Sequence, residues 1–127
     1  MLKKTDESIE AICNSYLDAW ARKDVEAIAA HLHPDVTFRA PMQQLHGRDA
    51  VIAATKRMMP MLKTLANRAQ FVAGDRAMFS YDFVCLEPVG VCRTAEQVRI
   101  EDDLIREIEL FFDPRPFVEA QRRAAAS

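Results

Sequence analysis

The stretch RAMFSYDFVCLEPVGVCRTAEQVRIEDDLIREIELFFD, residues 76–113, predicts three consecutive antiparallel strands. Bulky apolar residues alternate with small or polar ones in each strand, which is the two-residue period of a half-buried β-strand. Clusters of proline, glycine and acidic residues separate the strands and predict the turns. Phe79, Tyr81 and Phe83 fall on one face of the first strand. The predicted strands and turns are, in order, 76–86, 87–90, 91–100, 101–103 and 104–112.

The residues before this meander predict helices and further strands. Apolar residues from Ile9 to Trp20 fall at i, i+3, i+4, i+7, i+8 and i+11, a single stripe that is typical of an amphipathic helix. Asp24 can cap a second helix, and Pro34 ends it. Helices gathered early and an antiparallel sheet after them indicate an α+β domain with its helices on one sheet face. The predicted helices begin near residues 6, 25 and 49, the predicted strands are 36–40 and 65–72, and segment 43–47 is predicted as a loop.

Length and composition predict one globular domain over residues 1–127, with 114–127 as a C-terminal tail. The formal net charge of −2 and the absence of a basic stripe argue against a nucleic-acid partner. No apolar run approaches the ~20 residues of a membrane span, and residues 1–10 lack the apolar core of a signal peptide. Three cysteines without a CxxC spacing fit a reducing cytoplasm. His31 and His33 lie on different sides of a helix, so this pair predicts no metal site. No cofactor is predicted either.

Four segments are informative together: YLDAWARKDVEAIAAHL at 16–32, HPDVTFRAP at 33–41, LHGRDAV at 45–51 and IELFFDP at 108–114. In order and spacing they resemble the SnoaL-like and ketosteroid isomerase-like domains of the nuclear transport factor 2 (NTF2-like) superfamily. The resemblance implies a cone in which a curved antiparallel sheet wraps around three N-terminal helices. It also implies an apolar pocket and, commonly, a dimer through the outer face of the sheet. Members include isomerases, dehydratases, cyclases and non-catalytic binding modules, so the fold does not fix the activity.

The resemblance also places residues in a catalytic site. Ketosteroid isomerases use an aspartate base, with a tyrosine and a protonated aspartate as hydrogen-bond donors to the oxyanion. Tyr16 matches the tyrosine, Glu96 falls at the second acid, and Ala40 occupies the position of the base. Because a methyl group cannot take a proton, the chain resembles the donor half of that site and not a standard ketosteroid isomerase. Tyr16 and Glu96 are the candidate catalytic residues, expected to converge within roughly 3–5 Å.

Counting residue pairs outward from the predicted hairpin turn independently places Glu96 on the aromatic face of the sheet. With the predicted four-residue turn, Tyr81 pairs with Glu96, and cross-strand partners share a face. A carboxyl group among aromatic rings loses hydration, which favours its neutral form. Two alternatives remain: a glutamate held by a tyrosine hydroxyl for structure alone, and Tyr16 as an ordinary core tyrosine. The same register sets Cys85 opposite Cys92, and both are expected to be reduced thiols.

Large apolar side chains on these faces predict the wall of the pocket, since small-molecule cavities are mostly apolar. His46 joins them because the resemblance places it near the pocket mouth, where a histidine titrates near neutral pH. For each of these residues an ordinary core or surface position is the alternative. The predicted substrate-binding residues are Trp20, Phe38, His46, Met58, Phe79, Tyr81, Phe83 and Val98.

The leading functional hypothesis is a SnoaL-like small-molecule enzyme or enzyme relative. It would act on a hydrophobic carbonyl or polyketide- or steroid-like compound, with Tyr16 donating to an oxygen and Glu96 serving as acid, base or second donor. The alternatives are a non-catalytic ligand-binding or dimerisation module and a protein-interaction domain. The expected partners are a small apolar or partly polar ligand and a second copy of the chain, with no nucleic acid and no membrane. The expected dimer face carries Val84, Arg93, Ala95, Gln97 and Arg99, which point away from the predicted pocket.

Overall fold

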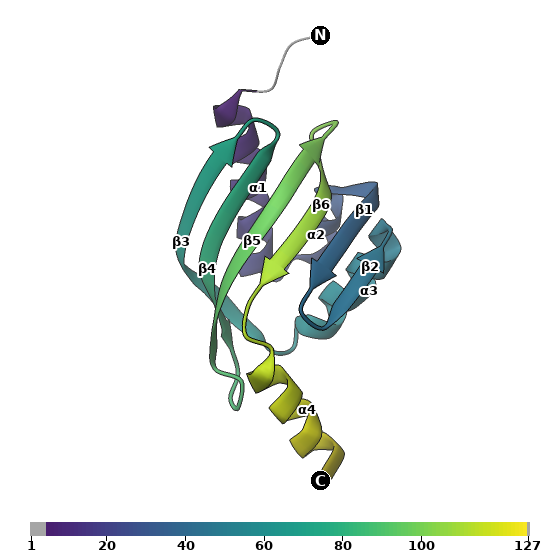
Figure 1. Cartoon of the computed structure of the whole chain (residues 1–127), viewed down its shortest axis with the longest axis vertical. Coiled ribbons are helices and arrows are strands. Elements are labelled where there is room, and N and C mark those ends of the chain that lie inside the picture. The colour runs from purple at the N-terminus through teal and green to yellow at the C-terminus, as the bar shows by residue number, and fades with distance from the viewer. Residues whose placement is uncertain (1–4, 127) are drawn as a thin grey trace.

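The computed structural model describes residues 5–126, in which helices pack on one face of a curved, six-stranded sheet (Figure 1). The architecture is α+β, as the sequence predicts. None of the helices within residues 5–126 is long and apolar enough to span a membrane. The elements are α1 Asp6–Ala21, α2 Val25–Ala30, β1 Leu32–Ala40, β2 Gln43–His46, α3 Arg48–Met58, β3 Leu62–Ala73, β4 Arg76–Cys85, β5 Val91–Glu101, β6 Leu104–Phe111 and α4 Arg115–Ala126.

The first two helices begin at side-chain caps that the sequence supplies. The Thr5 hydroxyl accepts a hydrogen bond from the Ser8 amide at 3.1 Å, and the Asp24 carboxylate accepts one from the Ala27 amide at 3.1 Å. Each cap satisfies one of the amides that a helix N-terminus leaves without a partner. α3 follows Gly47, whose φ of 91° is a conformation that favours glycine.

The sheet is mixed, whereas the sequence predicted a wholly antiparallel one. Its strand order is β2-β1-β6-β5-β4-β3, and β1 runs parallel to β6 while the other described pairs are antiparallel. A parallel pair needs a long crossover, which α3 and the β3–β5 meander supply here. Segment 43–46, predicted as a loop, forms β2 and pairs with β1. With a single apolar residue it shows no alternation, so the sequence carried no strand signal there.

β4 and β5 pair two residues away from the predicted register. Phe79 faces Glu96, and Tyr81 faces Thr94. The loop between the strands covers residues 86–90, one residue more than the predicted turn. A shift of two residues keeps every side chain on its predicted face. Glu96 therefore still points to the concave side of the sheet.

The cysteines are free and buried, and the shifted register changes one predicted contact. Cys92 faces Phe83 across the strands, so it does not lie opposite Cys85. Burial raises the pKa of the Cys13 thiol to about 12 and that of Cys85 to about 11. Both thiols are thus protonated near neutral pH and poor nucleophiles.

Most of segment 114–127, predicted as a tail, forms α4. Proline is tolerated in the first turn of a helix, and Pro116 lies there. Phe117 is 6% exposed, and its ring meets Phe112 edge-to-face with 5.5 Å between centroids. Arg115 donates to the Asp113 carboxylate through its backbone amide at 3.0 Å and through its guanidinium. In Figure 1, α4 leaves the body at the end of the molecule opposite the start of α1.

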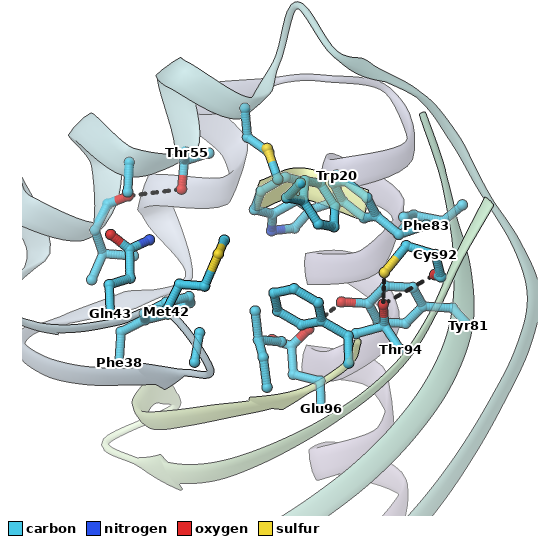
Figure 2. Close-up of a pocket in the computed structure, with 18 of the residues that line it drawn as sticks. Trp20, Phe38, Met42, Gln43, Thr55, Tyr81, Phe83, Cys92, Thr94 and Glu96 are labelled. Atoms are coloured by element: carbon cyan, nitrogen blue, oxygen red, sulfur yellow. Dashed lines mark hydrogen bonds between the residues drawn. The ribbon is translucent and has the colours of Figure 1, made fainter. Parts of the chain in front are cut away.

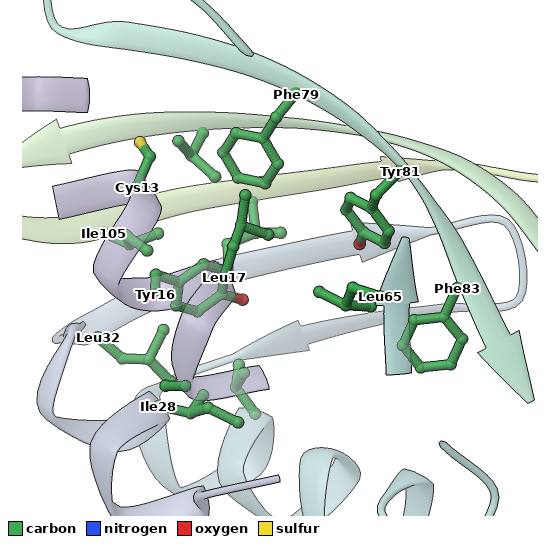
Figure 3. Packing of buried hydrophobic residues seen from close by; sticks show 14 of the residues in the cluster. Cys13, Tyr16, Leu17, Ile28, Leu32, Leu65, Phe79, Tyr81, Phe83 and Ile105 are labelled. Carbon is green, nitrogen blue, oxygen red and sulfur yellow. The ribbon is translucent and has the colours of Figure 1, made fainter. Parts of the chain in front are cut away.

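The core lies between α1 and the narrow end of the curved sheet. The predicted apolar stripe is the buried face of α1, with Ile9, Cys13 and Leu17 inward. These residues belong to one cluster with Phe79 and Ile105 from the sheet (Figure 3). Phe79 is fully buried.

We predict that Phe79→Ala lowers the free energy of unfolding by about 3–5 kcal/mol, because it removes a fully buried ring and leaves a cavity. Phe83→Ala is the matched control, since that ring already borders an open cavity and its loss costs less. Chemical denaturation of the two variants and the wild type measures the difference. If Phe83→Ala lowers the free energy of unfolding as much as Phe79→Ala or more, the assignment of Phe79 to the core and Phe83 to the cavity wall is contradicted.

Candidate functional site

A cavity of about 140 Å³ lies between α1, α3 and the concave face of the sheet (Figure 2). Its lining is mostly aromatic and aliphatic. Met42, in the turn between β1 and β2, is 44% exposed and marks the outer end. Tyr16, Tyr81 and Glu96 are buried and mark the inner end. A ligand would thus meet apolar walls first and polar groups last.

Helix and strand periodicity together aim side chains into this cavity. Tyr16 and Trp20 are one helical turn apart on α1, and Tyr81 and Phe83 are two residues apart on β4. The rings of Trp20 and Phe83 meet edge-to-face with 6.0 Å between centroids, which is a favoured aromatic geometry. β5 contributes Cys92, Thr94 and Glu96 by the same alternation. The predicted site residues that line the cavity are Tyr16, Trp20, Phe38, Met58, Tyr81, Phe83 and Glu96.

Three predicted substrate-binding residues do not line the cavity. Phe79 and Val98 lie deeper in the cone, where both are packed in the core with almost no exposed surface. His46 is exposed on β2, where it pairs with Thr37 on the outer face of the sheet. It was expected in a loop, and the formation of β2 turns it away from the cavity because side chains alternate along a strand.

Several cavity residues were not predicted. Cys92 and Thr94 line the cavity because they lie on the same face of β5 as Glu96. Phe112 and Phe117 close one side of the cavity from the C-terminal segment. The pattern D-P-R-P followed by helix-forming residues was a signal for α4 that the prediction of a tail overlooked. The other lining residues outside the predicted substrate-binding set are Met42, Gln43, Val51, Ala54, Thr55, Leu65 and Leu110.

Glu96 is the central polar group of the cavity. The residue is 3% exposed, and the Tyr81 hydroxyl donates a hydrogen bond to Oε1 at 2.7 Å. Burial raises the pKa of Glu96 from its ordinary value of 4.5 to about 7, although hydrogen bonds from Tyr81 and Tyr16 lower it in part. Desolvation disfavours the charged form, and donated hydrogen bonds favour it. Both protonation states of Glu96 are therefore accessible near neutral pH.

Tyr16 and Tyr81 remain neutral hydrogen-bond donors. Burial, followed by the nearby charge of Glu96, raises the pKa of both hydroxyls well above the ordinary value. The Tyr16 ring also meets the His31 ring edge-to-face, with 6.3 Å between centroids. His31 lies 2.7 Å from the Ala27 carbonyl through Nδ1, so it is part of the helix packing.

The arrangement can exchange a proton with a ligand at one point. A buried carboxyl group with a near-neutral pKa can accept or donate a proton at pH 7. Tyr16 and Tyr81 beside it can donate hydrogen bonds to an oxygen or to the carboxylate itself. Ala40, at the position where the resemblance places a base, does line the cavity and offers only a methyl group.

One group of potential metal ligands lies away from the cavity. His33, Glu101 and Asp102 bring ligand atoms within 4.8 Å of one another. His33 Nδ1 accepts a hydrogen bond from the Asp35 amide at 3.0 Å, which uses the single lone pair of a neutral imidazole. Glu101 accepts a hydrogen bond from Arg99 at 3.1 Å. These residues fit an ion-pair network better than a cation site.

Comparison with known proteins gives one family match. Residues 14–108 match the family described as a SnoaL-like domain. The matched segment ends before Phe112 and Phe117, so the side of the cavity that they form lies outside it. No curated protein matches the chain.

Solved structures share the fold at low sequence identity. A protein from Kribbella flavida DSM 17836 has a TM-score of 0.83 at 24% identity, covering 92% of this chain and 96% of that one. A de novo designed protein with a curved β-sheet has a TM-score of 0.80 at 16% identity, covering 98% and 100%. A candidate polyketide cyclase from Xanthomonas campestris pv. campestris has a TM-score of 0.77 at 16% identity, covering 90% and 96%. At these identities the likeness shows the fold alone.

We predict that Glu96→Gln flattens the dependence of stability on pH. The folded pKa of about 7 lies above the ordinary 4.5, so between these values the unfolded chain has released the proton and the folded chain still holds it. The free energy of unfolding of the wild type therefore falls as pH rises through this window, by on the order of 3 kcal/mol at most. Glutamine cannot ionise and removes this fall.

Urea denaturation at pH values from about 4 to 8 compares the wild type with Glu96→Gln. Glu10→Gln, an exposed position on α1, is the control and is expected to follow the wild type. Parallel profiles for the wild type and Glu96→Gln between pH 4.5 and 7 would contradict a raised pKa at Glu96.

Proposed function

The chain belongs to the SnoaL-like domain family and has the NTF2-like fold, and from that premise we propose that it acts on a small, mainly apolar carbonyl compound by acid–base chemistry. Glu96 is the group that gains and loses the proton, and Tyr16 is the donor to the ligand oxygen. The observation that supports this is the buried Glu96 carboxyl group, bonded to Tyr81 at 2.7 Å, at the inner end of an apolar cavity.

In the proposed reaction Glu96 begins as the carboxylate. It removes a proton from a carbon next to the carbonyl group, so that the substrate becomes an enolate and Glu96 becomes a neutral acid. The Tyr16 hydroxyl donates a hydrogen bond to the enolate oxygen, where negative charge develops. Return of the proton to the same or a conjugated carbon restores the carboxylate and completes an isomerisation or exchange. A pKa near the working pH serves both proton transfers.

A non-catalytic ligand-binding module is the second candidate. Ala40 in the cavity wall favours it, because the resemblance places the general base at this position. The hydrogen bond from Tyr81 to Glu96 is equally compatible with a structural role. The two candidates differ in one respect: only the enzyme exchanges a substrate proton through Glu96.

We predict that the wild type accelerates hydrogen–deuterium exchange next to the carbonyl group of 2-cyclohexen-1-one in D2O near pH 7. Glu96→Gln should lose about 100-fold or more of this rate, which is the usual contribution of a general base. Tyr16→Phe should also lose about 100-fold, since one hydrogen bond to the oxyanion is removed. Proton NMR measures the rates, and Glu10→Gln is the control.

Binding is measured in parallel through Trp20, the single tryptophan of the chain, which lines the cavity. A ligand in the cavity should change its fluorescence. Binding without exchange would favour the ligand-binding module over the enzyme. If the wild type shows no binding and no exchange with small cyclic ketones or phenols, both candidates are contradicted.

The outer face of the sheet carries an apolar patch that fits a two-fold dimer. Phe71 and Met78 are cross-strand neighbours, exposed by 72% and 40%, and Phe111 is 45% exposed. Exposed apolar patches of this kind mark interaction sites. We propose that two copies pack through this patch together with the predicted outward residues Val84, Arg93, Ala95, Gln97 and Arg99.

We predict that the chain sediments as a dimer at micromolar concentration and that Met78→Asp shifts it to the monomer, because a carboxylate would lose water in the interface. Val118→Asp, on the exposed side of α4, is the control and should remain dimeric. A monomeric wild type in analytical ultracentrifugation would rule the dimer out.

The free cysteines indicate the kind of cellular compartment in which the protein works. The three thiols at positions 13, 85 and 92 are buried and unpaired with one another. Such cysteines persist as thiols in reducing compartments. We therefore propose a cytoplasmic location.

A further inference from the structure

We propose that the cavity takes a ligand the size of one six-membered ring and that Phe117 of α4 sets this limit. The inference rests on the proposed function, because it assigns a size class to the carbonyl compound of the same site. It follows from the volume of the cavity, from the origin of its walls and from the way in which α4 is held.

The volume of the cavity matches a single ring. It measures about 140 Å³, close to the ~150 Å³ of an apolar protein cavity that binds one benzene molecule. Pockets for drug-sized ligands span about 300–1,000 Å³. A four-ring compound therefore does not fit between the walls as they stand. This narrows the broader expectation of polyketide- or steroid-like substrates to monocyclic carbonyl compounds.

The inner walls of the cavity are fixed by the packing of the core. Tyr16 and Tyr81 belong to the core cluster, and Glu96 is buried beside them, with its carboxyl group already bonded to the hydroxyl of Tyr81. Interiors are close-packed, and moving such a wall would disturb the core. The inner end therefore fixes both the position of the polar contact and the depth to which a ring can enter.

Phe117 is different, because it reaches the cavity from α4, where it is the one buried residue among those the structure describes. Its ring is buried and lines the cavity, while its neighbours Val118 and Glu119 are exposed. Its ring contact is the edge-to-face pair with Phe112. Phe117 and Phe112 thus come from the C-terminal segment, whereas the polar end of the cavity is built from α1, β4 and β5. Truncating Phe117 would enlarge the cavity and leave its polar end intact.

The placement of Phe117 is built into the turn that leads to α4. The Asp113 carboxylate accepts hydrogen bonds from the Arg115 amide at 3.0 Å and from its guanidinium at 2.7 Å. The Phe117 amide donates to the Pro114 carbonyl at 3.0 Å. These contacts direct the first turn of α4 so that Phe117 enters the cavity. Because Phe117 lies beyond the residues that match the family, the size limit is a property of this chain and not of the matched domain.

The test uses phenols of increasing size, since a phenol presents the planar ring and hydroxyl of an enol. Phenol and 2-naphthol are titrated against the wild type, Phe117→Ala and Phe117→Leu, with Trp20 fluorescence and calorimetry as readouts. The wild type should bind phenol at least about tenfold more tightly than 2-naphthol, because the second ring meets Phe117. Phe117→Ala should reverse or abolish this preference by tightening 2-naphthol at least about tenfold, and Phe117→Leu should fall between. Val118→Ala is the control and should match the wild type.

The possible outcomes distinguish a failure of the size limit from a failure of the proposed function. If Phe117→Ala and Phe117→Leu, folded by circular dichroism, keep the preference of the wild type, Phe117 does not set the limit and the proposed function stands. If the wild type binds 2-naphthol as tightly as phenol, the single-ring limit is wrong. If the wild type binds neither phenol nor cyclohexenone, the proposed function fails and the size limit fails with it.

Discussion

The carboxyl group of Glu96 lies out of contact with bulk water and takes its stabilisation from the side chains around it. Burying an ionised carboxyl group destabilises the fold unless hydrogen bonds stabilise its charge. Tyr81 supplies one at 2.7 Å, from the neighbouring strand of the same sheet. Tyr16 acts on the same group from α1. The helix and the sheet must therefore keep a fixed distance, and this requirement links the polar end of the cavity to the packing of the core.

The curvature of the sheet provides the space, and the fold by itself does not provide the chemistry. A designed protein shares the architecture, so the cone can form without selection for a reaction. The chemistry depends on the side chains of the concave face: a buried acid, two tyrosines and a mostly apolar remainder. Phe117 adds a boundary from outside the matched domain. Burial of such a ring contributes roughly 1.5–3 kcal/mol, enough to hold the first turn of α4 in place.

Much of the fold could be predicted from local patterns. Alternation predicted the strands of the meander, and the stripe from Ile9 to Trp20 predicted the buried face of α1. The predicted register of Glu96 was wrong by two residues, yet its face was right, because side chains repeat every two residues along a strand. The parallel pairing of β1 with β6 could not be predicted, since it depends on contacts between segments far apart in the chain. Phe79 and Val98 were placed by face alone, which does not distinguish depth in the cone. His46 was placed by the resemblance in a loop, and the pairing of β2 with β1 could not be predicted from its sequence.

The most direct test is the titration of the Glu96 carboxyl group itself. Carbon-13 NMR of the glutamate side chains, with Glu96→Gln to assign the resonance, gives its midpoint. A buried carboxyl group available for proton transfer should titrate near pH 7, and its midpoint should move when phenol occupies the cavity. A midpoint at or below about 4.5, the ordinary value for glutamate, with no response to phenol would contradict the account.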